Sequence, residues 1–158
     1  RMKSFSEEMR LKGRNVLTEI VHVGLHTPPP VLAAQMGLSK SEHTLQIRRL
    51  RGHEQCFPLV LLTSELPERL GVAPTEDFSK SLYMLLQNKY GIAISHGLES
   101  IRASKATVEE ARLLGIEIGE TVLVIERLTY RRGDTQPIEF VRGVYRYDQY
   151  TFSMTVRR

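Results

Sequence analysis

Apolar and polar residues alternate with a period of two along much of the chain, which is the pattern of strands with one buried face. The alternating stretches are rich in β-branched and aromatic residues, which favour strands. Several of these stretches are separated only by short turns, so they are expected to pair antiparallel. The pattern predicts seven strands, at 15–27, 44–53, 57–66, 92–103, 120–132, 136–148 and 150–158.

Other segments carry the signals of helices. Ser4 or Ser6 can cap a first short helix, and three prolines open a second one. A third has leucines at helical spacing and ends before Gly91, and Thr107 with Glu110 forms a capping box at the start of a fourth. The predicted helices lie at 5–13, 28–37, 79–90 and 107–114. Strands joined directly, with helices between some of them, indicate an α+β domain.

Composition fits one soluble globular domain of 158 residues, with 41% hydrophobic and 25% charged residues. The longest apolar run, 59–62, is far shorter than the ~20 residues that cross a bilayer, so we expect no membrane segment. The single cysteine, Cys56, favours a reducing cytoplasm. A net charge of +4 is too mild to predict a DNA-binding surface. Because the chain begins Arg1-Met2, we expect an excised fragment.

Positive charge gathers on the predicted strand 44–53. Side chains alternate across a strand, so Arg49 and Arg51 share one face, with Cα atoms ~6.6 Å apart, and that face begins with apolar residues. Two guanidinium groups at this spacing can converge on one phosphate or carboxylate. A solvated strand end or an internal salt bridge is the alternative that spacing alone favours.

The predicted strand 136–148 offers complementary chemistry. Glu139, Gly143 and Tyr145 share a face, and the glycine leaves a gap where a ligand ring could lie. A carboxylate and a phenol suit the hydroxyl or amine groups of a small polar molecule. Ser79 or Ser81 would cap the helix at 79–90, whose free N–H groups attract anions. An exposed Glu, a half-buried Tyr and simple capping are the plainer interpretations.

No catalytic or cofactor motif competes with this interpretation. The five histidines are scattered without metal-ligand spacing, Cys56 precedes no base motif, and there is no glycine-rich phosphate loop. We therefore expect neither a catalytic residue, nor a metal, nor a cofactor.

Five blocks of sequence, in order, resemble one family. They are "SFSEEMRLKG", "RRLR…FPLVLLTSELP", "SLYMLLQNKYGI", "ESIRASKATVEEARLLGIEIGETVLVIERLTY" and "QPIEFVRGVYRYDQYTF". Together they are similar to the UTRA domain, the effector-binding half of bacterial GntR-type transcription regulators of the HutC subfamily. The resemblance covers nearly the whole chain, so residues 1–158 are expected to form one ligand-sensing domain.

The resemblance implies a chorismate-lyase-like fold, which is a mainly antiparallel sheet with packed helices. It also implies a homodimer that binds a small anionic metabolite, such as a sugar phosphate or an organic acid. Complete members carry an N-terminal winged helix-turn-helix that binds operator DNA, and nothing in this chain resembles that module. Effector binding would then modulate DNA binding through the missing domain.

The same resemblance assigns effector-binding positions at both ends of a pocket. A pair of Leu residues, Leu61-Leu62, stands where many relatives that bind sugar phosphates have an acid, which affects the choice of effector. An enzyme of the same fold acting on a small carboxylate, and a purely structural dimerisation module, are the alternatives. The implied effector-binding residues are Phe5, Ser6, Arg49, Arg51, Ser81, Tyr83, Glu139 and Tyr145.

Overall fold

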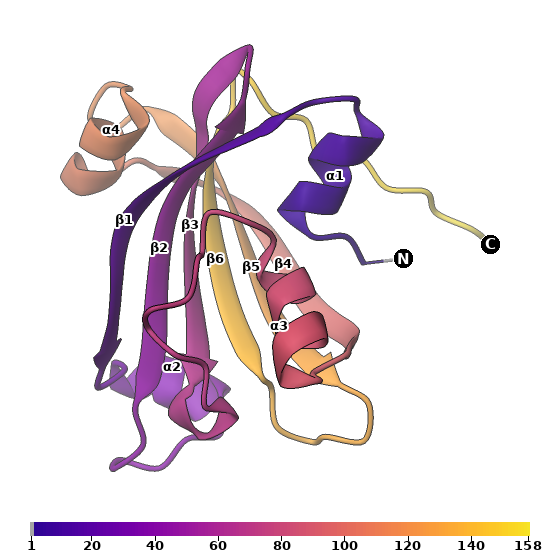
Figure 1. Ribbon diagram of the computed structural model, residues 1–158. Helices are drawn as coiled ribbons and strands as arrows, with labels where there is room; N and C mark the ends of the chain where they lie inside the picture. The colour runs from indigo at the N-terminus through magenta and orange to yellow at the C-terminus, as the bar shows by residue number, and fades with distance from the viewer. Residues whose placement is uncertain (1) are drawn as a thin grey trace.

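The computed structural model describes residues 2–158, which form one antiparallel sheet with helices on both faces (Figure 1). The α+β class predicted from the alternation pattern is therefore confirmed. In chain order the elements are α1 (Phe5–Leu11), β1 (Val16–His26), α2 (Pro30–Gln35), β2 (Thr44–His53), β3 (Cys56–Pro67), the 3-10 turn η1 (Glu68–Leu70), α3 (Leu82–Tyr90), β4 (Ile94–Lys105), α4 (Val108–Leu114), β5 (Thr121–Arg131) and β6 (Glu139–Arg146).

The six strands lie in the order β1-β2-β3-β6-β5-β4, and every neighbouring pair is antiparallel. Two hairpins, β2-β3 and β5-β6, meet in the middle of the sheet because β3 pairs with β6. Strands β1 and β4 are the two edges. The centre of the sheet is thus built from segments about 80 residues apart in sequence, such as Leu62 and Gly143.

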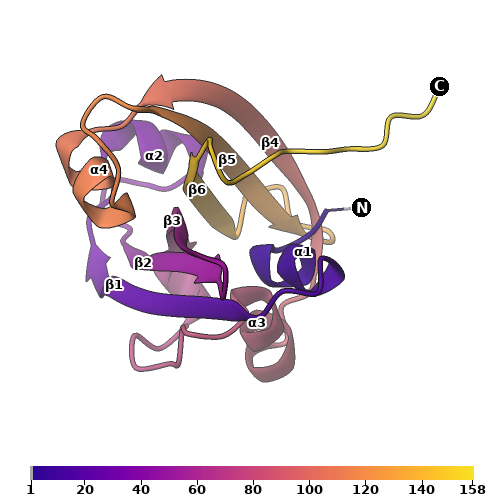
Figure 2. The same cartoon turned by 90° about the horizontal axis from the view of Figure 1, so that it is seen from above.

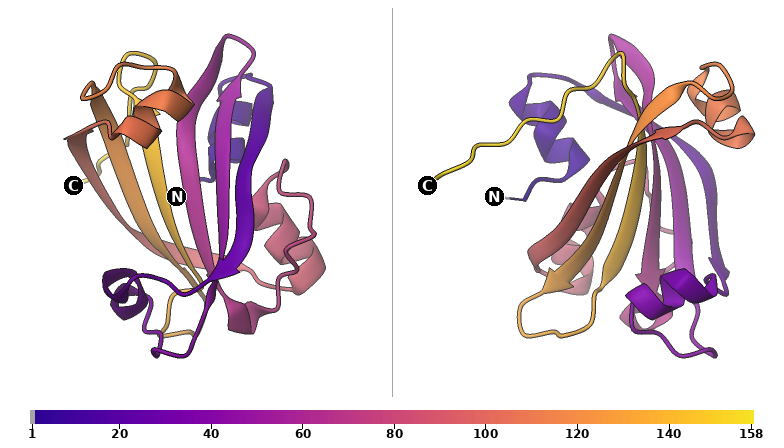
Figure 3. Two further views of the ribbon diagram at one scale, coloured as in Figure 1. Left: turned by 90° about the vertical axis from the view of Figure 1, so that its left-hand side faces the viewer. Right: turned by 180° about the vertical axis from the view of Figure 1, so that it is seen from behind.

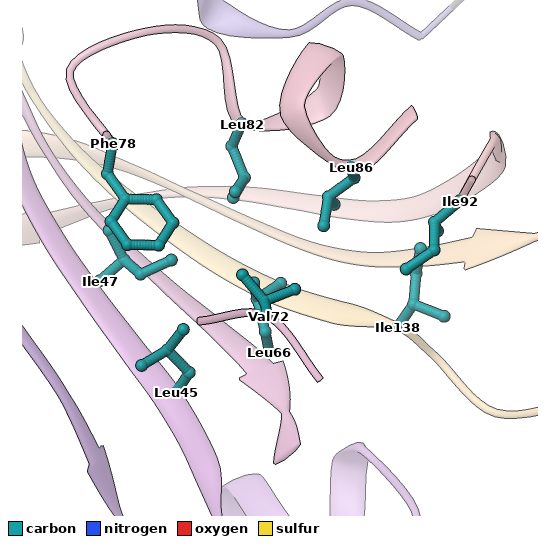
Figure 4. Close-up of a cluster of buried hydrophobic side chains, with 9 residues drawn as sticks. All are labelled: Leu45, Ile47, Leu66, Val72, Phe78, Leu82, Leu86, Ile92 and Ile138. Atoms are coloured by element: carbon teal, nitrogen blue, oxygen red, sulfur yellow. The ribbon is translucent and has the colours of Figure 1, made fainter. Parts of the chain in front are cut away.

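Helices cover the two faces of the sheet unequally. Helices α1 and α3 lie over one face, and α4 lies over the other (Figures 2 and 3). Below α3, apolar side chains from β2, β3 and the helix form one cluster, which includes Ile47, Leu66 and Leu86 (Figure 4). A second cluster lies under α4 and a third lies under α1, which includes Phe5 and Met9.

Helix boundaries follow the capping chemistry of the sequence. The Ser4 hydroxyl accepts the Glu7 N–H at 3.1 Å and caps α1, and both bonds of the predicted Thr107–Glu110 capping box are formed at α4. Helix α3 begins later than predicted, at Leu82. The reason is local, because residues 78–80 form a turn ahead of the helix and Ser81 is its cap.

One predicted strand is wrong. Residues 150–158 alternate as a strand does, yet residues 151–158 form no secondary structure and the segment runs away from the body of the domain (Figure 1). A strand requires a neighbour, and none of the strands of residues 2–158 pairs with this segment. Strand β4 is also shifted by two residues from its predicted position, to Ile94–Lys105.

No helix within residues 2–158 is long and apolar enough to cross a membrane.

Candidate functional site

A cavity of about 680 Å³ lies between the sheet, α1, α3 and residues 151–155 of the C-terminal segment. Five basic and three acidic side chains line it, so its charge is net positive. All the residues that the sequence assigned to a pocket border this one cavity, which brings together segments from both ends of the chain. They are Phe5, Ser6, Arg49, Arg51, Ser81, Tyr83, Glu139 and Tyr145.

Strand register explains how these residues meet. Arg49 on β2 is paired with Leu62 on β3, which is paired with Gly143 on β6. In the next row, Arg51 follows the same course through β3 to Tyr145. Residues in one row across a sheet point to the same face. The prediction that Arg49 and Arg51 share one face of their strand, as Gly143 and Tyr145 do on theirs, is therefore confirmed. The pairing of β3 with β6 brings these two sets of residues to the same face of one sheet.

The two arginines are buried without a counter-charge. Each is only 3% exposed. Arg49 Nη1 donates to the carbonyl oxygens of Phe78 and Lys80, both at 3.3 Å, and its Nε has no partner in the described chain. Neither guanidinium forms an ion pair with any carboxylate of residues 2–158. The internal salt bridge that spacing alone favoured is therefore not what holds these side chains.

Arg51 has a different set of neutral partners. Its Nε donates to Thr18 Oγ1 at 3.0 Å, its Nη2 donates to Ser6 Oγ at 3.1 Å, and its guanidinium lies 5.2 Å from the centre of the Phe5 ring. These contacts connect β1, β2 and α1. Helix α1 is thus held over the cavity partly by the arginine that lines it.

Burial weakens the proton affinity of both guanidinium groups. Loss of hydration lowers the pKa of Arg49 to about 10, although the charge of Glu139 partly opposes this shift. Burial, followed by the neighbouring charge of Arg49, lowers the pKa of Arg51 to about 9. In both cases the cost of burial outweighs the attraction of nearby negative groups, so the pKa is lowered.

The other end of the cavity contains a buried carboxylate. Glu139 accepts hydrogen bonds from the hydroxyls of Tyr83 and Thr129, each at 2.9 Å. Arg127 Nη1 donates to the Tyr83 hydroxyl at 3.3 Å, and its Nη2 forms an ion pair with Glu99 at 3.2 Å. Burial, with the charge of Glu139, raises the pKa of Tyr83, which keeps this phenol protonated and able to donate.

Gly143 does not leave the open gap that the sequence suggested. A Cβ atom at this position would lie 2.7 Å from Cε2 of Tyr145 and 3.2 Å from Cδ2 of Leu62. The ring of Tyr145 therefore folds back over the glycine of its own strand and fills the space. Gly143 itself lines the cavity, so a ligand ring beside it remains a prediction.

Of the two candidate caps, Ser81 begins helix α3. Its hydroxyl accepts the Met84 N–H at 3.4 Å, whereas Ser79 bonds to Asp77 instead. Ser81 also lines the cavity, so the N-terminus of α3 faces the same space as the arginines.

Of the two leucines in place of an acid, only Leu62 lines the cavity. Leu61 points to the opposite face and joins the cluster under α4.

Sequence reasoning missed Ser64, Arg127 and the C-terminal wall of the cavity. Ser64 Oγ and Arg127 Nε are buried and have no hydrogen-bond partner within residues 2–158, as is also true of Arg49 Nε. All of these atoms belong to residues that line the cavity. Parity along β3 and β5 would have placed both side chains on the cavity face, had the strand order been known. Unpaired buried polar atoms are rare and call for a missing partner.

Comparisons with known proteins agree with this geometry. The UTRA domain model matches residues 11–151. The chain is 32% identical over 96% of its length to the HTH-type transcriptional repressor NagR of Bacillus subtilis, and 28% identical over 96% to the repressor PhnF of Mycolicibacterium smegmatis. It covers 62% of the length of each of these relatives. The crystal structure of the effector domain of PhnF from Mycobacterium smegmatis is similar over 100% of this chain and 97% of that one, with a TM-score of 0.91 and 27% identity.

Proposed function

Because the chain belongs to the UTRA domain family, we propose that its cavity binds a small anionic metabolite, such as a sugar phosphate or an organic acid. The chain is an effector-binding domain of a GntR-family transcription regulator, and it is a regulatory rather than an enzymatic domain. The observation that carries the proposal is the pair of buried arginines with no carboxylate partner in residues 2–158.

The anionic group of the effector binds at the arginine end of the cavity. An oxyanion between Arg49 and Arg51 gains charge-assisted hydrogen bonds, and it also faces the N-terminus of α3 at Ser81. Arg49 Nε and Ser64 Oγ are the unpaired groups that a ligand can satisfy.

The neutral part of the effector lies toward Glu139 and Tyr83. A buried carboxylate accepts hydrogen bonds from hydroxyl or amine groups, and the Tyr83 hydroxyl, which donates its proton to Glu139, can accept one. Tyr145 lies in the same row as Arg51 and lines the cavity there, and Phe5 and Ser6 line it from helix α1. This arrangement suits a molecule with an acid at one end and hydroxyl groups at the other.

The regulator acts as a homodimer in the cytoplasm, on operator DNA, through an N-terminal DNA-binding domain outside this chain. Support comes from the relatives, which are named as HTH-type repressors and are longer than the present chain. An effector that binds one arrangement of the dimer better shifts the population toward it and so changes DNA affinity.

Substitution of the arginines tests the anion site. Inorganic phosphate serves as the probe, with binding measured by calorimetry or thermal shift. Arg49→Ala and Arg51→Ala should each weaken binding by at least roughly tenfold, since a hydrogen bond to a charged group contributes ~1.5–3 kcal/mol.

Arg48→Ala is the matched control. It removes a guanidinium from the same strand, but Arg48 points to the other face and pairs with Glu109 at 2.5 Å. Phosphate binding by this variant should match that of the unmodified domain. Normal phosphate binding by both cavity variants, with only a loss of stability, would show that the arginines have a structural role and that the domain is a dimerisation module.

A further inference from the structure

Tyr150 stands between two cavities of the domain. Besides the cavity described above, a smaller one of about 250 Å³ lies between helix α1, the β2–β3 hairpin and the turn that follows β6. Three residues line both cavities, and they are Lys12, Tyr150 and Thr151. The side chain of Tyr150 is therefore part of the wall that separates the two spaces.

The Tyr150 ring is held by side chains of α1 and β6. Its hydroxyl donates to Glu8 Oε1 at 2.9 Å, and its face packs on Tyr145 with the ring centres 4.2 Å apart. Lys12 Nζ lies 5.4 Å from the ring centre and also pairs with Glu8 at 3.3 Å. The hydrogen bond to Glu8 is the directional contact of the ring, so it fixes the angle at which the ring stands.

The ring also has room to turn. Side chains in a close-packed interior are held by neighbouring atoms on every side. Tyr150 instead borders about 680 Å³ of unfilled space in one direction and about 250 Å³ in another. When its bond to Glu8 breaks, the ring can swing into either space by rotation of its own side chain, and the two cavities then join.

The shared wall lies toward the arginine end of the larger cavity. Tyr145, on which the ring packs, is in the same row of the sheet as Arg51. The smaller cavity lies toward the β2–β3 hairpin, where His53 and Leu59 line it. A path past Tyr150 therefore leads from the hairpin side of the domain to the place where an anionic group would bind.

The smaller cavity favours anions over cations. Lys12 and Arg14 line it, and none of the acidic residues among residues 2–158 does. Their carboxylate partners, Glu8 at 3.3 Å and Glu54 at 3.9 Å, lie outside its lining. An anion in this space thus meets cationic side chains first, and a concave site of one charge raises the local concentration of the opposite ion.

We infer that the smaller cavity is the entrance for the anionic effector, and that Tyr150 is a gate that opens when its bond to Glu8 breaks. This route rests on the proposed anion site and adds the way by which an anion reaches it. The Tyr150 hydroxyl bonds to Glu8, so the gate sets how fast an anion enters and leaves. The arginines set how tightly the anion is held.

Tyr150→Phe tests the gate, because it keeps the ring and removes the hydroxyl that bonds to Glu8. Titration of the domain with inorganic phosphate, followed by NMR line-shape analysis, gives the association rate, the dissociation rate and the dissociation constant. Both rates should rise by roughly tenfold, because a hydrogen bond to a charged group no longer holds the ring. The dissociation constant should stay the same, since entry and exit change together.

Two further variants complete this test. Glu8→Ala removes the acceptor of the same hydrogen bond from the side of α1, so it should also raise both rates. Tyr147→Phe is the matched control, because it removes a phenol hydroxyl from a residue that is 56% exposed and lines neither cavity. All three binding parameters of this control should match those of the unmodified domain.

Arg14→Gln tests the entrance. Loss of this charge should lower the association rate of phosphate by roughly threefold at low salt, with little change in the dissociation rate, because it acts before the anion passes the gate. Arg10→Gln removes the same charge from an exposed residue of α1 that lines neither cavity. It should have a much smaller effect.

The outcomes separate the gate from the anion site. Unchanged rates in both Tyr150→Phe and Glu8→Ala, with normal phosphate affinity, would overturn the gate alone and show that anions enter elsewhere. A weaker affinity of Tyr150→Phe without faster association would also overturn it, and would make the hydroxyl a binding contact. Absence of phosphate binding to the unmodified domain would overturn the anion site and the route together.

Discussion

Arg49 and Arg51 are held by hydrogen bonds to neutral oxygens, and this arrangement decides what the cavity attracts. Two backbone carbonyls and two hydroxyls fix the guanidinium groups in place but neutralise neither. A carboxylate in the same place would have made a buried ion pair and left no site for an external anion. Within residues 2–158 no carboxylate forms an ion pair with Arg49 or Arg51, so the charge of both guanidinium groups is left uncompensated at this end of the cavity.

Anion binding should weaken as the pH rises above about 9. The pKa of Arg51 is lowered to about 9 in the empty domain, and a bound anion favours the charged form and raises that pKa again. Binding therefore takes up protons, and its affinity is constant below this pKa and falls as the pH passes through it. Calorimetric titration with sulfate, which stays a dianion throughout, between pH 7 and 10 and in buffers of different ionisation enthalpy, measures both effects.

Arg51→Gln is the control for this prediction. The variant lacks the titrating group, so any residual binding should lose most of its dependence on pH in the range near 9. A dependence of the same size in the variant would assign the effect to another group.

At the scale of helices and strands, the two faces of the sheet differ: one carries the cavity, and the other is covered by α4. Helix α1 carries Phe5 and Ser6 to the cavity, whereas α4 packs on the core of the opposite face. Both helices have seven residues and a capping hydroxyl on the residue just before them, so they can be weakened in the same way.

Loss of each cap should cost similar stability but have different effects on binding. Ser4→Ala and Thr107→Ala each remove a capping hydroxyl, which should lower the free energy of unfolding by about 1 kcal/mol in urea denaturation. Only Ser4→Ala should weaken phosphate binding, because it loosens the helix that closes the cavity. Ser4→Thr retains a capping hydroxyl and should restore binding; if it does not, Ser4 acts by direct contact rather than through the helix.

The sequence predicted most helices and strands, but it did not predict which strands pair with one another. Capping residues and period-two alternation are local signals, so the helix at Thr107 and the hairpin strands around Arg49 could be predicted. Ser64 and Arg127 could not be assigned to the cavity from sequence. Their side chains share a face with Arg49 only because β3 pairs with β6 and β6 pairs with β5, and these pairings are not visible in the sequence. The strand predicted at 150–158 was wrong for the same reason, since pairing depends on a partner and not on the pattern alone.

At the scale of the whole molecule, the cavity floor is made by two hairpins that are distant in sequence. Residues of β2 and β3 supply the arginine end, and residues of β5 and β6 supply the carboxylate end. A ligand that contacts both ends bridges the centre of the sheet. Its binding therefore stabilises the fold as a unit and not only the nearest loop.

Saturation with an anion should raise the melting temperature of the domain. At 100 times its dissociation constant a ligand adds ~2.7 kcal/mol, which for a domain of this size corresponds to roughly 5–10 °C. Differential scanning calorimetry in phosphate or sulfate measures the shift, with chloride at equal ionic strength as the control. A crystal structure in the same salt should show the anion between β2 and the start of α3. An equal shift in chloride, or an empty site in that crystal, would contradict the prediction.

The ring of Tyr145 lies against Gly143, and this contact offers a route by which the cavity can change during evolution. A methyl group at position 143 would meet the ring at 2.7 Å, so the ring would have to swing away from the sheet and into the cavity. One carbon atom on the strand would thereby shrink the accessible volume while every residue that contacts the effector stays the same. Related sensors could thus come to prefer smaller effectors through a substitution that no inventory of contact residues would reveal.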